Sequence, residues 1–252
     1  MGNRRILKKL IKSVGGRFSS DLDIDISSQN PEQIFKWFLA SVLFGTRISE
    51  GIVMRTYREF EKEGILLPER ILNTGWDGLV EILDRGGYVR YDFKTATKLL
   101  DMSAALTDKY GGDLNVLHST ASGPEDIEIR LKALARGIGD VTVNIFLREM
   151  RGIWGKADPL PSDLVVTAAK HMGIIPERIT DRSKILCVLK KKWADEGMKM
   201  QDFPDFETAL LRLGKDYCKK GLCDRCSMKC KCRGGLTNNC PRVIYVFSGG
   251  IL

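Results

Sequence analysis

The segment over residues 31–63 constrains the fold most, because its first half is apolar nearly all the way round a helix. It begins PEQIFKWFLASVLF, where Pro31 suits the first turn of a helix. A helix with apolar residues on every face is buried on every side. A break at Gly45 and Thr46 then precedes a second helical stretch. This pattern predicts that the first helix is buried within a core built from helices.

The rest of the chain continues the helical pattern, with glycines between the segments. Gly75, the pair Gly86 and Gly87, and the pair Gly111 and Gly112 separate further helical stretches. Runs that alternate apolar and polar residues, as strands do, are scarce, so we predict an all-α protein. With 252 residues, 43% of them hydrophobic, the chain can bury one large core or two small ones. No apolar stretch approaches the length of a membrane-spanning helix.

A glycine turn lies between two helical stretches at residues 126–151. The residues LARGIGDVTVNIF place Gly137 and Gly139 on either side of Ile138, which is typical of a helix-hairpin-helix motif. Glycine lets a phosphate approach the backbone, and the N–H groups that begin a helix attract anions. We therefore expect Gly137, Ile138, Gly139 and Val141 to contact a DNA phosphate, with the Ile138 side chain pointing inward. The alternative is an ordinary turn between two helices.

Four segments in the same order resemble the endonuclease III superfamily of helix-hairpin-helix DNA glycosylases. The segments are WFLASVLFGTRISEGIVMRTYREF, GGYVRYDFKTATKLLDMSAAL, LARGIGDVTVNIFLREM and DPLPSDLVVTAAKHMGI, and the resemblance extends over residues 31–233. It implies a two-lobed, all-α fold. One lobe would be a six-helix unit over residues 31–150. The other would combine residues 1–30 with residues 151–252.

The resemblance also implies a catalytic carboxylate shortly after the hairpin, and Asp163 in PLPSDLVV is the matching residue. In this family the carboxylate faces the extruded nucleotide. Positive charge develops on the sugar as the glycosidic bond breaks, so a fixed carboxylate lowers the barrier or orients a water molecule. Asp158 is the rival candidate. A capping role for Ser162 or Asp163 at the next helix is the structural alternative, and it is compatible with catalysis.

Val141 stands where the bifunctional members of the family have a lysine. That lysine forms a Schiff base with the sugar and permits strand cleavage, whereas valine has no amine. The resemblance therefore implies a monofunctional glycosylase, which leaves an abasic site. Two alternatives stay open: a bifunctional glycosylase/lyase that takes an amine from elsewhere, such as Lys156, and a non-catalytic DNA-binding protein with a zinc knuckle. Asp140 also departs from the family pattern, because its carboxylate repels a phosphate unless it caps the following helix.

A base inside a duplex must be extruded before an enzyme can reach its glycosidic bond. Alignment to the plug segment of the family places Arg47, in FGTRIS, near the vacated space. A phosphate contact or a surface arginine explains Arg47 equally well. Tyr88 and Tyr91 are candidates for lining or flanking the base pocket, although such tyrosines also pack structurally. The sequence does not specify the base, which could be an alkylated purine, uracil, mismatched thymine or adenine.

Five of the seven cysteines fall within residues 218–232. Four of them have the spacing C-x4-C-x2-C-x5-C, and its last two intervals match those of endonuclease III; they are Cys218, Cys223, Cys226 and Cys232. Thiolates so arranged suit a four-iron four-sulfur cluster. A zinc ion, with Cys230 replacing one ligand, is the alternative.

The remaining residues of the cysteine loop are rich in positive charge. We expect Lys219, Lys220 and Arg225 to contact DNA phosphates. Cys187 and Cys240 stand apart from the cluster and are expected to be ordinary thiols.

The net charge of +8 is concentrated towards the two ends of the chain. Residues 1–14 contain five Lys or Arg and no acid, while residues 212–233 contain eight Lys or Arg against two Asp. Such surfaces favour a polyanion, and an anionic membrane surface would fit the bare charge as well. With the resemblance, we expect a monomer that binds double-stranded DNA carrying a lesion or mismatch, and no membrane. We found no role for the tail over residues 234–252.

The first eighteen residues are basic but lack the apolar core of a secretory signal. We therefore expect a cytoplasmic, nucleoid-associated protein, or a nuclear one if the host has a nucleus. In that reducing setting, clustered cysteines favour metal or cluster ligands over disulfides.

Overall fold

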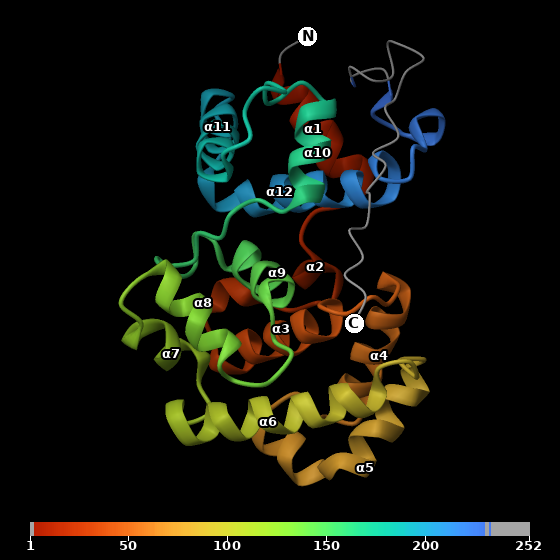
Figure 1. The fold of residues 1–252 in the computed structure, drawn as a ribbon, viewed down its shortest axis with the longest axis vertical. Coiled ribbons are helices and arrows are strands. Elements are labelled where there is room, and N and C mark those ends of the chain that lie inside the picture. The colour runs from red at the N-terminus through yellow and green to blue at the C-terminus, as the bar shows by residue number, and fades with distance from the viewer. Residues whose placement is uncertain (1–2, 230–231, 233–252) are drawn as a thin grey trace, which may run out of the picture. The chain divides into compact units, whose positions relative to one another are not determined.

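The computed structural model describes residues 3–229 and residue 232, and this part of the chain is helical, without a β-strand (Figure 1). The all-α class predicted from the sequence is therefore confirmed. The described residues form two compact units. One unit spans residues 17–159, and the other combines the residues up to 16 with those from 160 onward. Among the described residues, no helix has both the length and the apolar character needed to span a membrane.

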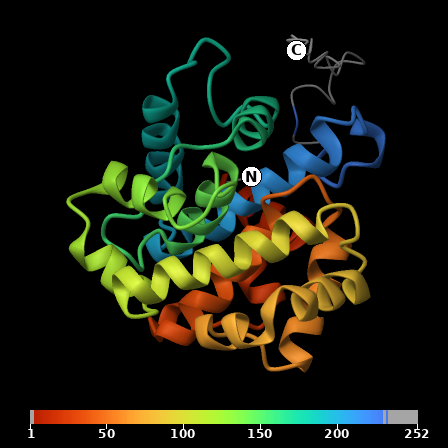
Figure 2. The same ribbon diagram turned by 60° about the horizontal axis from the view of Figure 1, so that its bottom comes forward.

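The larger unit is built around a buried helix, α3. The helices of this unit are α2 (Phe18–Asp21), α3 (Pro31–Phe44), α4 (Glu50–Lys62), α5 (Pro68–Gly86), α6 (Asp92–Tyr110), α7 (Leu114–Thr120), α8 (Pro124–Lys132) and α9 (Asp140–Met150). Helix α3 contacts α4, α7 and α9. Helices α5 and α6 lie side by side, and α4 packs on α5 (Figures 1 and 2).

Helix α3 forms where the sequence predicts it, and its surroundings explain why. The Asn30 side chain accepts a hydrogen bond from the N–H of Glu32 at 2.9 Å, which caps the helix, and Pro31 occupies the first turn. Trp37 is fully buried and donates from Nε1 to the carbonyl of Phe146 in α9 at 3.1 Å. Nine of the ten residues from Ile34 to Leu43 are buried. The predicted burial of this helix on all sides is therefore confirmed.

The boundaries of the larger unit differ from the predicted boundaries at residues 31 and 150. Residues 17–30 belong to this unit because the N–H groups of Phe18 and Ser19 donate to the buried carboxylate of Glu149, at 2.9 and 3.0 Å. Residues 151–159 belong to it because Trp154 donates from Nε1 to Oδ1 of Asn115 at 2.9 Å. These hydrogen bonds join segments that are far apart in the sequence, so local sequence patterns cannot reveal them.

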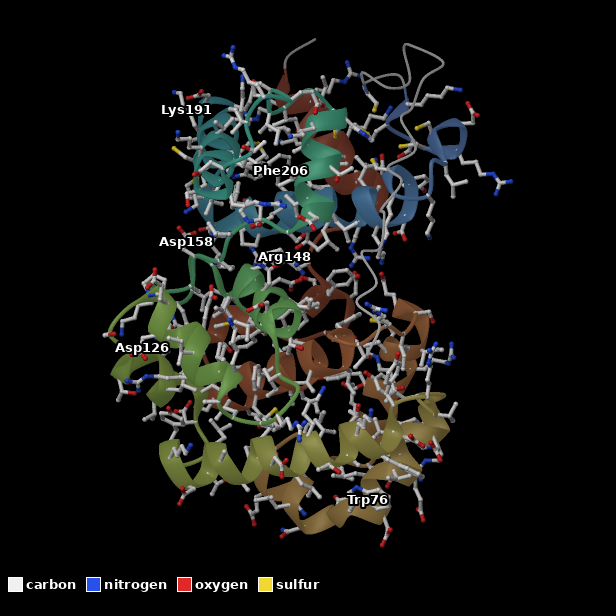
Figure 3. The ribbon with its side chains drawn as sticks, in the orientation of Figure 1. Trp76, Asp126, Arg148, Asp158, Lys191 and Phe206 are labelled. Atoms are coloured by element: carbon white, nitrogen blue, oxygen red, sulfur yellow. The ribbon has the colours of Figure 1, made fainter. Side chains whose placement is uncertain are left out.

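The core of the smaller unit combines aliphatic side chains with a small aromatic cluster. Its helices are α1 (Asn3–Val14), α10 (Asp163–His171), α11 (Arg182–Asp195) and α12 (Phe203–Leu213). Helix α12 contacts both α1 and α10. Trp193 stacks on Phe206, the latter labelled in Figure 3, with ring centroids 5.2 Å apart. A π-helical turn over Gly214–Cys218 then leads from α12 into the cysteine loop.

Candidate nucleic-acid interface

The predicted glycine turn is present between α8 and α9 and spans residues 133–139. Gly137 has φ +90°, a backbone conformation that residues with a Cβ rarely adopt. Ile138 is only 4% exposed, as expected for a side chain that points inward between the two helices. The turn therefore has the backbone and the packing of the predicted hairpin.

Gly139 is the residue that keeps the start of α9 open. It occupies the N-cap position, where no side chain caps the helix. A Cβ placed on Gly139 would meet no described atom within 4 Å. Because the first N–H groups of an α-helix have no partner within the helix, this open end offers donors at the positive end of the helix dipole.

The Asp140 carboxylate, which by itself would repel a phosphate, is balanced by a neighbouring lysine. The Asp140 side chain is 89% exposed at the first position of α9, and its carboxylate pairs with the ammonium of Lys132 at the end of α8. This pair raises the pKa of Lys132, chiefly through its hydrogen bond to Asp140. The adjacent Val141 is 63% exposed and presents no polar group.

The two candidate aspartates lie in different surroundings. Asp158 pairs with Arg151, whose guanidinium is nearly buried and also donates to the carbonyl of Pro159 at 2.7 Å. Asp163 begins α10, and 68% of its side chain is exposed. Asp158 is therefore held by a nearly buried arginine, with 40% of its own side chain exposed, whereas Asp163 is the more exposed of the two and stands at a helix start.

An arginine that the sequence analysis overlooks holds Asp163. Arg182 donates to the Asp163 carboxylate and to the carbonyl of Pro161, the latter at 3.2 Å. The preceding N-cap residue, Ser162, makes no capping hydrogen bond with its side chain. The Asp163 carboxylate is thus oriented by an arginine nineteen positions away, and no local motif could have indicated this pairing.

The four predicted cluster ligands line one pocket of the smaller unit. The residues around it are Leu213, Tyr217, Cys218, Cys223, Cys226, Met228, Lys229 and Cys232. The N–H of Met228 donates to Sγ of Cys226 at 3.4 Å. Burial raises the pKa of Cys226, and the neighbouring Cys232 and Cys223 act in the same direction. Four thiols gathered at one pocket are a suitable donor set for an iron-sulfur cluster.

Zinc, the alternative to a cluster, needs four ligands around one ion. Four thiolates must reach one zinc ion at about 2.3 Å each. Among the described residues, no group of three or more His, Cys, Asp or Glu side chains is arranged to hold a metal ion. Cys230 and Cys240 lie outside the described residues, and Cys187 is exposed on α11.

Basic residues line the exposed surfaces of the smaller unit. In the cysteine loop Lys219, Lys220 and Arg225 are exposed. On α1 four exposed residues share one face at helical spacing, while Leu7 and Leu10 on the opposite face are buried; the four are Arg5, Lys8, Lys9 and Lys12. Both surfaces can therefore attract phosphates without any change in packing.

The remaining predicted residues lie in the larger unit. Arg47 is exposed in the loop between α3 and α4. Tyr91 is partly buried, and the Arg90 guanidinium lies 5.5 Å from the centroid of its ring.

Tyr88 requires a correction, because it packs in the core of the unit. Its side chain is fully buried, its hydroxyl donates to the carbonyl of Leu43 at 2.7 Å, and it also contacts the hydroxyl of Thr46. Burial raises the pKa of Tyr88 to about 12. Tyr88 therefore anchors the segment that leads into Arg47, and it does not line a base pocket.

These features define an all-α protein with a helix-hairpin-helix turn, and its fold is that of the endonuclease III type. A similar solved structure is that of a non-covalent complex of endonuclease III with DNA. The likeness has a TM-score of 0.54 at 18% sequence identity, and it covers 93% of this chain and 95% of that chain. It confirms the fold that the sequence resemblance implied. No family model matches the chain, and no curated protein matches it.

Proposed function

We propose that this chain is a monofunctional DNA glycosylase, which extrudes a damaged or mismatched base and hydrolyses its glycosidic bond. The observation that carries this proposal is the open start of α9 at Gly139, in a protein with the endonuclease III fold. The N–H groups of the turn and of the first helical turn would hold one phosphate of the DNA backbone. Such a contact fixes position and is independent of base sequence.

The Asp163 carboxylate supplies the chemistry in this proposal. As the bond between C1′ and the base breaks, its electron pair leaves with the base and positive charge develops on the sugar. Water adds at C1′ and gives up one proton, while the departing base takes up one proton, so the products are the free base and an abasic sugar. The carboxylate stabilises the developing charge or orients the water. Arg182 keeps the carboxylate in one orientation. Asp158 is a poorer candidate because it lies in the loop before α10, whereas Asp163 begins that helix, as the family pattern requires.

The positions of two residues support the use of water over an amine. Val141 is exposed at the position that bifunctional relatives fill with lysine, and its side chain cannot form a Schiff base. The rival amine, Lys156, donates to the backbone carbonyls of His118 and Ser119, at 2.8 and 3.0 Å. These hydrogen bonds hold the Lys156 side chain at the end of α7.

We also propose a four-iron four-sulfur cluster on Cys218, Cys223, Cys226 and Cys232. Their common pocket supports this proposal. When bound, the cluster would fix the shape of the loop, so that the exposed Lys219, Lys220 and Arg225 would be held towards DNA phosphates. Iron, inorganic sulfide and zinc should be measured on protein purified without oxygen. Stoichiometric iron with sulfide is expected, and stoichiometric zinc without iron would contradict the cluster.

One assay tests the function and separates it from the alternatives. The protein is incubated with duplexes that each carry one defect: an alkylated purine, uracil opposite guanine, thymine opposite guanine, or adenine opposite a damaged guanine. Each sample is divided and analysed with and without alkali. Breaks that need alkali on one of these duplexes are expected. Breaks without alkali would indicate a lyase, and binding without abasic sites on any duplex would indicate a DNA-binding protein.

A further inference from the structure

A lysine of α6 lies against the glycine turn. Lys98 packs its side chain beside Gly137, and a Cβ on that glycine would stand 3.1 Å from Cε and 3.6 Å from Nζ of Lys98. Gly137 thus leaves room for the lysine as well as adopting its positive φ. Lys98 comes from residues 92–110, far from the turn in sequence, so the approach depends on the fold.

The Lys98 ammonium is partly buried, and the described part of the chain places no counter-charge beside it. Burial is the cause that lowers its pKa, and no nearby charged side chain acts on it. Within the described residues it makes no hydrogen bond or ion pair. A cation that is partly removed from water without a partner is costly. Lys156 in the same unit shows the usual solution, since two carbonyls accept its hydrogen bonds.

We propose that Lys98 is part of the phosphate site of the hairpin, and that its ammonium binds the same backbone phosphate as the N–H groups that begin α9. This inference rests on the proposed function and adds a side chain to a contact otherwise made by backbone. The amides orient the phosphate, and the ammonium supplies the charge that the turn lacks. Asp140 does not oppose this, because Lys132 balances its carboxylate.

Lys94 offers a matched control, because it lies one turn earlier on α6 and is exposed. Binding of Lys98→Met, Lys98→Arg and Lys94→Met is measured on a short duplex with a tetrahydrofuran abasic-site analogue over a range of salt concentrations. Lys98→Met should weaken binding about tenfold and reduce the slope of log affinity against log salt by about one. Lys98→Arg should keep most of the affinity, and Lys94→Met should bind like the unchanged protein.

A second measurement uses the unchanged protein and so does not depend on how a variant folds. Surface lysines are acetylated with and without the same duplex, and the labelled sites are quantified by mass spectrometry. DNA should protect Lys98 several-fold more than Lys94. Equal labelling of Lys98 with and without bound DNA, or wild-type affinity and salt slope for Lys98→Met, would overturn the inference while base release stood. If the unchanged protein binds no duplex, the proposed function and this inference both fail.

Discussion

Each end of helix α9 has an acidic residue beside a cation, but the two pairs have different roles. At its end, Glu149 is fully buried and accepts two backbone N–H groups, and Arg148 lies beside it with Nη2 3.9 Å from its carboxylate. At its start, Asp140 is exposed and pairs with Lys132 on the surface. The charges at the end join segments of the unit, whereas the start leaves backbone donors available. Exposure and available backbone N–H donors, and not the presence of charge, therefore mark the candidate DNA contact.

The largest effect on stability is expected at the buried end. Glu149→Ala should lower the free energy of unfolding by about 3 to 5 kcal/mol, because it leaves two buried N–H groups without their acceptor and removes the carboxylate beside the buried Arg148. Urea denaturation measures this loss. Glu81→Ala, at an exposed position of α5, is the control and should change stability by no more than about 0.5 kcal/mol. Similar stability for the two variants would show that the end of α9 does not hold the unit together.

Substitutions at the two glycines of the turn should have different effects: one should lower stability, and the other should weaken DNA binding. Gly137→Ala should cost about 1 to 2 kcal/mol of stability, because alanine resists φ +90° and its methyl group would crowd Lys98. Gly139→Ala should fold with unchanged stability, since its φ of −114° suits alanine and its Cβ would meet open space. Its affinity for abasic-site DNA should nevertheless fall about tenfold, because the methyl group would occupy the position of the phosphate. Unchanged affinity would show that no DNA phosphate binds at the start of α9.

The smallest effect is expected from the surface pair at the start of α9. Lys132→Met should weaken DNA binding only a few-fold, because exposed ion pairs are worth about 1 kcal/mol or less. The double variant Lys132→Met with Asp140→Asn should recover most of that loss, since the uncovered carboxylate is then gone. Dissociation constants at one fixed salt concentration provide the measurement. Failure of the second substitution to restore binding would mean that Asp140 does not face the phosphate.

The sequence predicted features that are set by local patterns. The burial of α3 followed from its apolar residues, and the hairpin followed from Gly137 and Gly139 with an inward Ile138. The overall fold followed from the order of four segments.

Features that depend on contacts between distant segments could not be predicted. The unit boundaries were misplaced because Glu149 binds Phe18 and Ser19 across more than a hundred residues. Tyr88 was misassigned because its motif does not reveal that its hydroxyl meets Leu43. The approach of Lys98 to the turn likewise exists only in the folded chain.

The proposed role of Asp163 is tested most directly by the rate of base release by Asp163→Asn, measured in a single turnover on the duplex from which the unchanged protein releases a base. The exposed position of Asp163 at the start of α10 means that asparagine should fit without loss of folding. Release is expected to slow about a hundredfold or more while affinity for abasic-site DNA is preserved. Release at the unchanged rate would contradict the catalytic role of Asp163, because the carboxylate would then have no part in breaking the bond.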